Sequence, residues 1–291
     1  MLRKLAALLL CAMAIPAALA QQTPPPPPAG GGGALAGTPG LPGNLFTSAR
    51  KVALSTLKRE WVHIPMGRGA LRTLIVHPAG NSPAPVVMLL HYDAGLDSLQ
   101  QSMAVQLAER GFIAVAPDLL SGLGPDGGHY DSFRFPDAAM RAVLSMNPAE
   151  AMRRYKIAHA YVNTLPRGNG SIAALGAGIG GTHSFRLATE VPDLSAAVVF
   201  YGLPPAARAL RNVNSPVLGL YGEDDPEVIA TLGPTEAAMK QSGKVYETRV
   251  YPGATHSFLS YVLEGRNGEA TASAWPAAME FLNQHSKQSG R

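Results

Sequence analysis

The chain has little cysteine and little charge. Of its 291 residues one is cysteine, Cys11, and 15% are Asp, Glu, Lys or Arg. A single cysteine excludes a small scaffold held together by disulfides. About 25% of the residues are charged in an ordinary globular domain. Here 46% are hydrophobic, which excludes a wholly disordered chain. The length suits one large domain or two small ones.

The first twenty residues predict a secretory signal peptide. Two basic residues precede an apolar run from Leu5 to Ile15, and Ala18-Leu19-Ala20 supplies small residues for cleavage before Gln21. The run is short for a membrane span, so an uncleaved anchor is the weaker interpretation. A lipoprotein signal at Cys11 is weaker still, because the bulky Leu10 precedes the cysteine. We therefore expect a periplasmic or secreted protein whose mature chain lies outside the membrane.

Removing the signal peptide changes the charge balance. Two of the 24 basic residues lie in it and none of the 20 acidic residues does, so the net charge falls from +4 to +2. No basic run or aromatic-basic stripe follows, which argues against nucleic-acid binding. Cys11 is removed as well. The mature chain then has no thiol nucleophile and no cysteine to bind a metal.

Residues 21–45 have low complexity. They contain a proline run, Pro24 to Pro28, and a glycine run, Gly30 to Gly33. Such a segment buries nothing and predicts a flexible tether. We expect one globular domain over residues 46–291, and a monomer.

Within that domain, apolar runs alternate with segments of helical spacing. The apolar runs predict strands over 61–65, 71–77, 85–90, 112–116, 171–175, 196–200, 217–221 and 245–251. Helices are predicted between Asp97 and Gly111, over 136–164 with an interruption at Pro148, and over 179–190, 226–241 and 271–286. This alternation predicts an α/β fold with a mostly parallel sheet and helices on both faces. Binding sites in such sheets lie beyond the carboxyl ends of the strands.

The loop after residue 175 has the frame of a nucleophile elbow. It reads Gly176-Ala177-Gly178-Ile179-Gly180. In the motif Gly-x-Ser-x-Gly the central residue stands at the apex of a sharp strand-to-helix turn, with its side chain exposed. Here the apex residue is Gly178, which has no side chain.

Two further loops supply an acid and a base. Asp225 follows the strand predicted to end at 221, with Asp224 as the alternative carboxylate. His256 lies in the turn after the last predicted strand. The order apex, acid, base is that of α/β-hydrolases. A nucleophile needs a base within hydrogen-bond reach, and the base needs an acid to hold its tautomer. Backbone N–H groups of Ile179 and of the loop 91–96 are the candidate oxyanion donors.

At these residues the chain resembles the dienelactone hydrolase family. The similarity covers nearly all of 57–286 and rests on His91 to Leu96, Ala116 to Gly122, Gly176 to Gly180, Phe200 to Gly202, Gly222 to Pro226 and Tyr251 to His256. It implies an α/β-hydrolase fold, no metal, no cofactor and a small ester or lactone as substrate, cleaved through a Cys–His–Asp triad. It makes His256 the base, Asp225 the acid and Gly178 the nucleophile position, with oxyanion donors at the amides of Ile179 and Asp93.

The chain departs from the family pattern at two pocket residues. Gly178 stands where the family has Cys or Ser, and Tyr92, after His91, stands where a Glu is common. Three interpretations of the missing nucleophile follow. A water activated by the Asp225–His256 pair could attack, Thr182 or Ser184 could substitute, or the protein could bind a ligand without catalysis.

Other polar residues have simpler explanations. His91 is expected to order its own loop. The remaining histidines show no metal-ligand spacing, and they are His63, His77, His129, His159, His183 and His285. Arg72, Arg134 and Arg186 are the candidates for contact with an anionic substrate, and the sequence does not choose among them.

Overall fold

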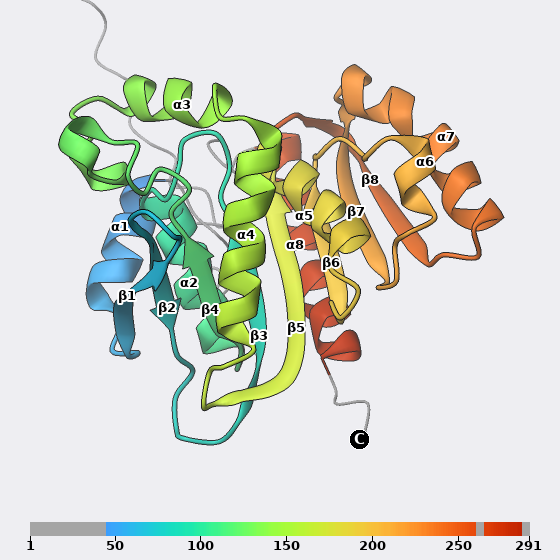
Figure 1. Ribbon diagram of the computed structural model, residues 1–291. Helices are drawn as coiled ribbons and strands as arrows, with labels where there is room; N and C mark the ends of the chain where they lie inside the picture. Colours follow the sequence, from blue (N-terminus) through green and yellow to red (C-terminus); the bar gives the residue numbers. More distant parts are fainter. Residues whose placement is uncertain (1–44, 260–264, 287–291) are drawn as a thin grey trace, which may run out of the picture. The chain divides into compact units, whose positions relative to one another are not determined.

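A computed structural model of the protein describes residues 45–259 and 265–286 (Figure 1). The expected signal peptide, 1–20, and all of the expected tether except Leu45 lie outside the described residues. Leu45 itself begins a helix, α1 (Leu45–Leu54), which the sequence pattern did not predict.

An eight-stranded sheet runs through the described part of the chain. Its order is β1-β2-β4-β3-β5-β6-β7-β8. Strand β2 is antiparallel to both of its neighbours, β1 and β4, and all other pairs are parallel. The strands are β1 (Arg59–Pro65), β2 (Ala70–Val76), β3 (Ala84–Leu90), β4 (Ile113–Pro117), β5 (Gly168–Ala177), β6 (Ala196–Phe200), β7 (Val217–Asp224) and β8 (Tyr246–Thr255). The predicted fold class is confirmed.

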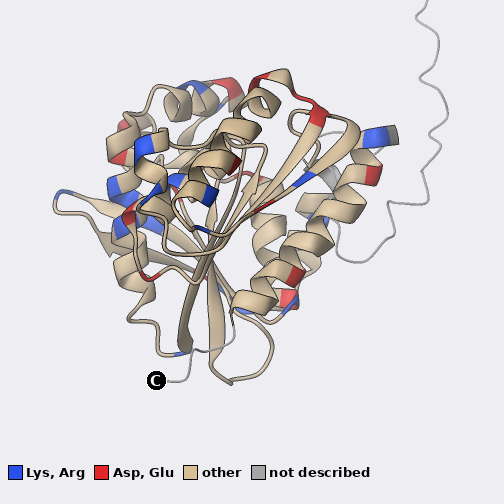
Figure 2. Ribbon diagram, turned by 90° about the vertical axis from the view of Figure 1, so that its right-hand side faces the viewer, with Lys and Arg blue, Asp and Glu red and all other residues tan. Residues whose placement is uncertain are grey.

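Helices cover both faces of the sheet, as the edge-on view in Figure 2 shows. One face packs against α2 (Ser98–Glu109) and α8 (Gly265–His285). The other packs against α4 (Pro148–Val162), α5 (Ile179–Glu190), α6 (Ala207–Leu210) and the end of α7 (Pro226–Gln241). A smaller cluster joins α3 (Pro136–Leu144) to the start of α5. Two short 3-10 helices, η1 (Pro125–Gly127) and η2 (Tyr130–Ser132), precede α3.

The central strands supply apolar side chains to the helices on both faces of the sheet. Strands β4 and β6 are buried at every position, and β3 is buried at all but one. A strand covered on both faces needs apolar side chains on both, which is why these segments are continuous apolar runs rather than alternating ones. The predicted break at Pro148 is also seen, because α4 begins there with Asn147 capping its first turn.

Strand ends were predicted less well than strand centres. Strands β5, β7 and β8 are each longer than the apolar runs that predicted them. In β8 the extra residues include Pro252 and Gly253, which are typical of a turn, yet ladder pairing with β7 extends to Asp224 opposite Thr255. Helix α6, like α1, was not predicted. Pairing with neighbouring strands therefore extends these strands past local turn signals.

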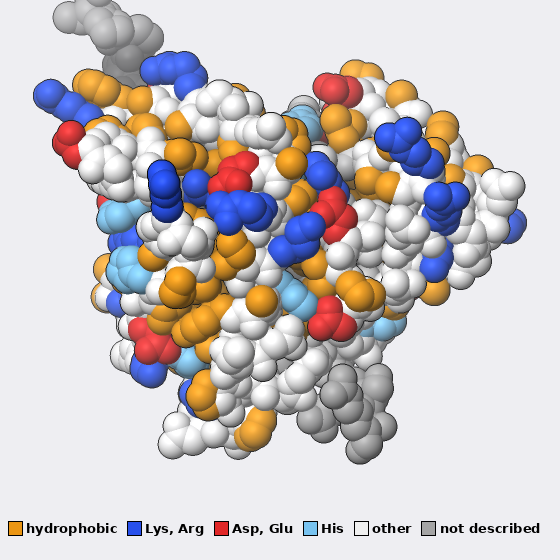
Figure 3. Space-filling view, in the orientation of Figure 1, with side chains coloured by type: hydrophobic (Ala, Val, Ile, Leu, Met, Phe, Trp, Pro, Cys, Tyr) orange, Lys and Arg blue, Asp and Glu red, His pale blue; other side chains and the backbone are white. Residues whose placement is uncertain are grey.

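Near the centre of the face seen in Figure 3, acidic side chains lie next to basic ones. Glu150 of α4 binds Arg153 and Arg154, and Glu190 of α5 binds Lys156 and Arg186. No helix in the described ranges is long and apolar enough to cross a membrane.

Candidate active site

The apex of the elbow lies between the end of β5 and the start of α5. Gly178 has φ 56° and ψ −123°. Its N–H donates to the Phe200 carbonyl at 3.0 Å, and its carbonyl accepts from the Thr182 N–H at 3.0 Å. These two bonds hold the apex in a conformation that side-chain-bearing residues adopt only under strain. The backbone therefore forms the sharp strand-to-helix turn that the sequence predicted.

Close packing explains the glycines on either side of the apex. A Cβ added at Gly176 would lie 2.1 Å from the Gly180 carbonyl oxygen, and one at Gly180 would lie 2.1 Å from that of Leu90. A Cβ at Gly181 would lie 2.7 Å from the Phe200 oxygen. At Gly178 the nearest atoms would be 3.9 Å away, an ordinary van der Waals contact. Sterics thus require glycine beside the apex but not at it.

The predicted acid and base are in contact. His256 Nδ1 lies 2.6 Å from Asp225 Oδ2. An ionised carboxylate only accepts hydrogen bonds, so Nδ1 carries the proton and Nε2 keeps its lone pair. Asp225 is 5% exposed and also caps α7 at the Val228 N–H. The alternative acid, Asp224, is exposed, and the geometry therefore favours Asp225.

Tyr201 joins the apex to the base, and sequence reasoning missed it. Its ring lies edge-on to the His256 ring, with centroids 5.2 Å apart. Its Cε2 atom would be 3.9 Å from a Cβ at Gly178. The residue is buried and has φ 40°, which is unusual for a side chain of this size. Its place in Phe200-Tyr201-Gly202, at the end of a buried strand, was the available signal.

Two backbone amides next to the apex and to Tyr92 have no hydrogen-bond acceptor among the described residues. Ile179 is the first residue of α5, so its N–H has no carbonyl acceptor within that helix. Neither this N–H nor that of Asp93 donates to another group in the described part of the chain. The predicted oxyanion donors are therefore available, and their role stays a prediction.

His91 and Tyr92 order the loop that carries Asp93. The fully buried His91 accepts from the Leu119 N–H at Nε2, 3.1 Å away, and Nδ1 donates to the Tyr92 carbonyl, 2.9 Å away. Burial lowers the pKa of His91, which keeps the ring neutral as these two bonds require. The Tyr92 hydroxyl donates to Asp97, the cap of α2. Its hydroxyl end thus points to α2 rather than over Gly178.

The two side chains considered as substitute nucleophiles do not lie at the apex. Thr182 Oγ1 accepts from the Leu203 N–H at 2.9 Å, and Ser184 is completely buried on α5. A hydroxyl that holds a backbone N–H is poorly placed to attack a substrate. Neither residue is brought to the apex.

Two of the three candidate arginines are held elsewhere. Arg72 donates to Asp131 at 2.7 Å and lies 3.5 Å from the Trp61 ring centroid, and Arg186 pairs with Glu190 at 2.8 Å. Arg134 lies over the Phe135 ring before α3.

Two of the other histidines each lie beside a single carboxylate. His77 binds Glu60 at 2.6 Å, and His159 lies 3.3 Å from Asp193. Among the described residues no group of three or more His, Cys, Asp or Glu side chains could hold a metal ion.

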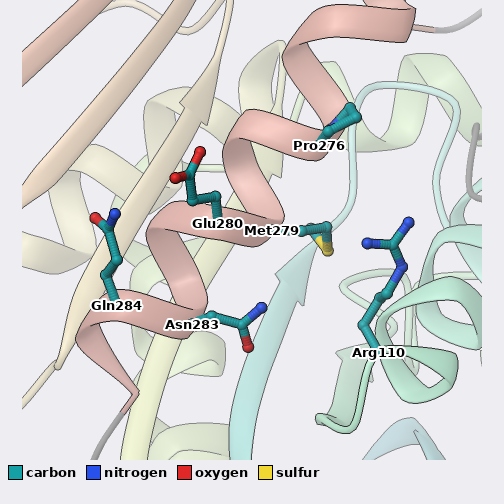
Figure 4. Close-up of a pocket in the computed structure, with 6 residues that line it drawn as sticks. All are labelled: Arg110, Pro276, Met279, Glu280, Asn283 and Gln284. Carbon is teal, nitrogen blue, oxygen red and sulfur yellow. The ribbon is translucent and has the colours of Figure 1, made fainter.

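A hollow of about 390 Å³ lies at the other end of the sheet. Arg110, at the end of α2, and five residues of α8 line it (Figure 4): Pro276, Met279, Glu280, Asn283 and Gln284. Helix α2 starts at the carboxyl ends of the strands and Arg110 is at its far end, so this hollow is remote from Gly178 and His256.

Comparison with known proteins identifies relatives over most of the domain. The model of the dienelactone hydrolase family matches residues 71–286. A protein of Saccharolobus solfataricus, provisionally named a carboxymethylenebutenolidase, is 28% identical over 247 residues, which are 75% of this chain and 95% of the relative. A Bradyrhizobium protein, provisionally named 2-oxo-3-(5-oxofuran-2-ylidene)propanoate lactonase, is 25% identical, over 80% of this chain and 97% of the relative.

Solved structures share the fold. A dienelactone hydrolase from Anabaena variabilis superposes with a TM-score of 0.63 at 22% identity, over 80% of this chain and all of the other. A dienelactone hydrolase-like promiscuous phosphotriesterase from metagenomic libraries gives 0.66 at 24% identity, over 79% and 99%.

Proposed function

The chain belongs to the dienelactone hydrolase family, and from that premise we propose that it hydrolyses a small ester or lactone with water as the nucleophile. One observation carries the proposal. The His256–Asp225 pair is intact at 2.6 Å, and the Tyr201 ring that touches His256 also borders the space at Gly178. The lactonase name of the Bradyrhizobium relative makes a lactone the first natural substrate class to test.

The proposed mechanism uses only residues described above. A water bound at Gly178 gives its proton to His256 Nε2 as its oxygen attacks the carbonyl carbon. The amides of Ile179 and Asp93 stabilise the oxyanion, and Asp225 stabilises the imidazolium that forms. When the carbon–oxygen bond of the ester breaks, His256 returns the proton to the departing alkoxide. No covalent intermediate forms.

A modest rate is expected. Serine proteases that lose a member of the triad keep roughly 10³–10⁴-fold catalysis over water, from binding and the oxyanion hole. The proposed enzyme adds a positioned general base to such a remnant, and this contributes typically about 10²–10⁴-fold.

The test is hydrolysis of phenyl acetate and of a small lactone by the purified protein. Replacing His256 by Ala should lower kcat/KM by about 10²-fold or more. His63→Ala is the matched control, because His63 is exposed on β1, and it should leave the rate unchanged. Equal rates for wild type and His256→Ala would refute the proposal.

A second candidate function is ligand binding without catalysis, favoured by the absence of a side chain at Gly178. It predicts that wild type and His256→Ala are equally inactive while Gly178→Cys gains esterase activity. That combination of results would direct the search to ligands of the same site.

We also propose that the protein is exported to the periplasm or beyond the cell, on the sequence of residues 1–20. N-terminal sequencing of the protein recovered from the periplasmic and culture fractions should begin at Gln21. Recovery of the intact N-terminus from the cytoplasm would contradict it.

A further inference from the structure

Strand β8 lies at one edge of the sheet, with β7 as its one partner strand in the described part of the chain. We propose that this edge pairs with β8 of a second copy of the protein, so that two chains form a two-fold symmetric dimer with one continuous sheet. The dimer replaces the monomer expected from the sequence. It does not depend on the proposed function, because no residue of the candidate active site takes part in it.

The outer edge of β8 presents main-chain groups that are free to pair. The Val217 N–H donates to the Val245 carbonyl at 3.1 Å, and from there the parallel ladder to β7 uses every second residue of β8. The N–H and C=O groups of Tyr246, Thr248 and Val250 therefore point away from β7. No other described residue forms a hydrogen bond with these outward groups. Such a row of unpaired groups is a template for another strand.

Main-chain geometry limits how two copies of this edge can pair. In an antiparallel pair, residues with outward groups lie opposite one another and exchange two hydrogen bonds. A two-fold axis through Thr248 places Thr248 opposite its own copy, and Tyr246 of each copy opposite Val250 of the other. All the outward groups of the three residues are then satisfied. Pro252 has no N–H, so the pairing ends before it.

The charges along the strand select the same register. The side chains of Glu247 and Arg249 are exposed, and no described residue forms a hydrogen bond or an ion pair with either. With the axis through Thr248, Glu247 of each copy lies opposite Arg249 of the other, on the same face of the sheet. The smallest shift that keeps the outward groups paired is two residues, and it places glutamate opposite glutamate or arginine opposite arginine. Like charges directly opposite each other destabilise a sheet.

The exposed valines of the strand find aromatic partners in this register. Val245 and Val250 are 53% and 43% exposed. Val250 lies opposite the half-buried Tyr246 of the second copy, and Val245 lies opposite the half-buried Tyr251. Cross-strand pairs of a β-branched and an aromatic side chain stabilise a sheet. Main-chain pairing, charge and apolar contact thus agree on one register.

The same charges favour a second copy over an unrelated partner. Charged side chains on an edge strand normally prevent pairing with other chains. An unrelated strand would have to present the opposite charges in the right order and at the right spacing. A copy of β8 in antiparallel orientation does so automatically, because Glu247 and Arg249 are equidistant from Thr248.

The first measurement is the mass of the purified protein in solution, by light scattering after size-exclusion chromatography and by sedimentation over a range of concentrations. Twice the mass of one chain is expected, with dissociation on dilution. A monomer at every concentration overturns the proposal.

Charge reversal then locates the interface. Glu247→Arg and Arg249→Glu should each raise the dissociation constant of the dimer by about tenfold or more, because two repulsive pairs replace two attractive ones. Glu280→Arg is the matched control, since Glu280 is exposed on α8 beside the hollow lined by Arg110, and it should leave the dissociation constant unchanged. A dimer that survives both β8 variants, or that the control weakens equally, overturns the proposal.

Mixing the two variants tests the register. In a mixed dimer of Glu247→Arg with Arg249→Glu, every reversed charge lies opposite a charge of the other sign. The two proteins, one of them fluorescently labelled, should therefore bind each other with close to the wild-type affinity. Failure of the two folded variants to associate overturns the antiparallel register.

A double variant covers the case in which a single reversal prevents folding. Glu247→Arg combined with Arg249→Glu exchanges the two charges within one chain and restores opposite pairs across the axis. It should dimerise with a dissociation constant close to that of wild type, and denaturant unfolding checks that each variant is folded. A folded double variant that stays monomeric overturns the proposal.

Discussion

The two halves of the candidate site retain different parts of a hydrolase. The half at the ends of β7 and β8 keeps its side chains, with His256 bound to Asp225 at 2.6 Å. The half between β5 and α5 keeps only its backbone, because Gly178 stands at the apex. Packing explains the contrast. The elbow glycines are fixed by contacts of the sheet and helix, whereas a side chain at the apex would touch little of the protein.

Strained non-glycine backbone is found next to His256, in the half of the site that keeps its acid and base. Tyr201 and Ser257 both have positive φ, and the one other non-glycine residue with this feature in the described ranges is Asp126 of η1. Each such residue costs about 1–3 kcal/mol and persists only where its surroundings hold it in place. Tyr201 contacts His256, and Ser257 is the residue after His256 in the sequence. The backbone next to the base is therefore strained at two residues.

The largest expected effect tests the acid–base half. Asp225→Asn should lower kcat for ester hydrolysis by about 10²–10⁴-fold, since an amide cannot hold the Nδ1–H tautomer of His256 as a carboxylate does. The amide can still cap α7, so the unfolding midpoint should stay close to that of wild type. An unchanged kcat would show that the pair does not act as base and acid.

The next effect tests the packing of the elbow. Gly180→Ala should destabilise the fold by about 3 kcal/mol, because the new Cβ would lie 2.1 Å from the Leu90 oxygen and the backbone must move. Denaturant unfolding of Gly178→Ala, which meets nothing closer than 3.9 Å, should show the smaller loss expected from strain alone. Equal losses of unfolding free energy in the two variants would show that a Cβ is no better tolerated at Gly178 than at Gly180.

A pH effect tests the helix behind the elbow. Burial lowers the pKa of His183 to about 4, helped by the positive charge of Arg186 and, once it is protonated, by that of His91. The unfolded chain takes up this proton near pH 6.5, so between pH 6.5 and 4 it binds more protons than the folded one. The free energy of unfolding should therefore fall as the pH falls through this window, by on the order of 3 kcal/mol.

His183→Gln should reduce that slope, and the exposed His63→Gln should leave it unchanged. Some slope should remain in His183→Gln, because burial also lowers the pKa of His91. If the free energy of unfolding fell by the same amount between pH 7 and pH 4.5 in wild type and in His183→Gln, the assignment would be contradicted.

The smallest expected effect on the fold comes from restoring the apex side chain. Gly178→Ser should cost about 1–3 kcal/mol of stability through its positive φ. It should nevertheless show a burst of phenol release, because the proposed mechanism needs His256 Nε2 and the amides of Ile179 and Asp93 to surround the apex, where the new hydroxyl would stand. Absence of the burst in a folded variant would show that the two halves are not aligned for covalent catalysis.

Much of the fold could be predicted because buried segments have recognisable apolar patterns in the sequence. Continuous apolar runs marked the covered strands, and Pro148 marked the start of α4. Chain segments whose structure depends on partners were missed or cut short, such as α1, which packs on α2, and the end of β8 through Pro252. Local signals there favoured turns, and pairing with β7 overrode them.

The candidate site was predictable to a similar degree. The order of Gly178, Asp225 and His256 placed them at the carboxyl ends of strands, and a parallel sheet brings such ends together. The order of the loop residues does not single out Tyr201, because its importance comes from a positive φ and from ring contacts. Its place in Phe200-Tyr201-Gly202, at the end of a buried strand, was the one available signal.

The open surroundings of Gly178 have an evolutionary consequence. A glycine codon that ends in a pyrimidine becomes a serine or cysteine codon by one base change. Since the backbone at the apex already has the required conformation and leaves a Cβ 3.9 Å from its neighbours, no second mutation is needed to make room. A form of this site with a nucleophilic side chain and the form with glycine thus differ by a single mutation. A lineage can change from one to the other while the fold around the apex stays the same.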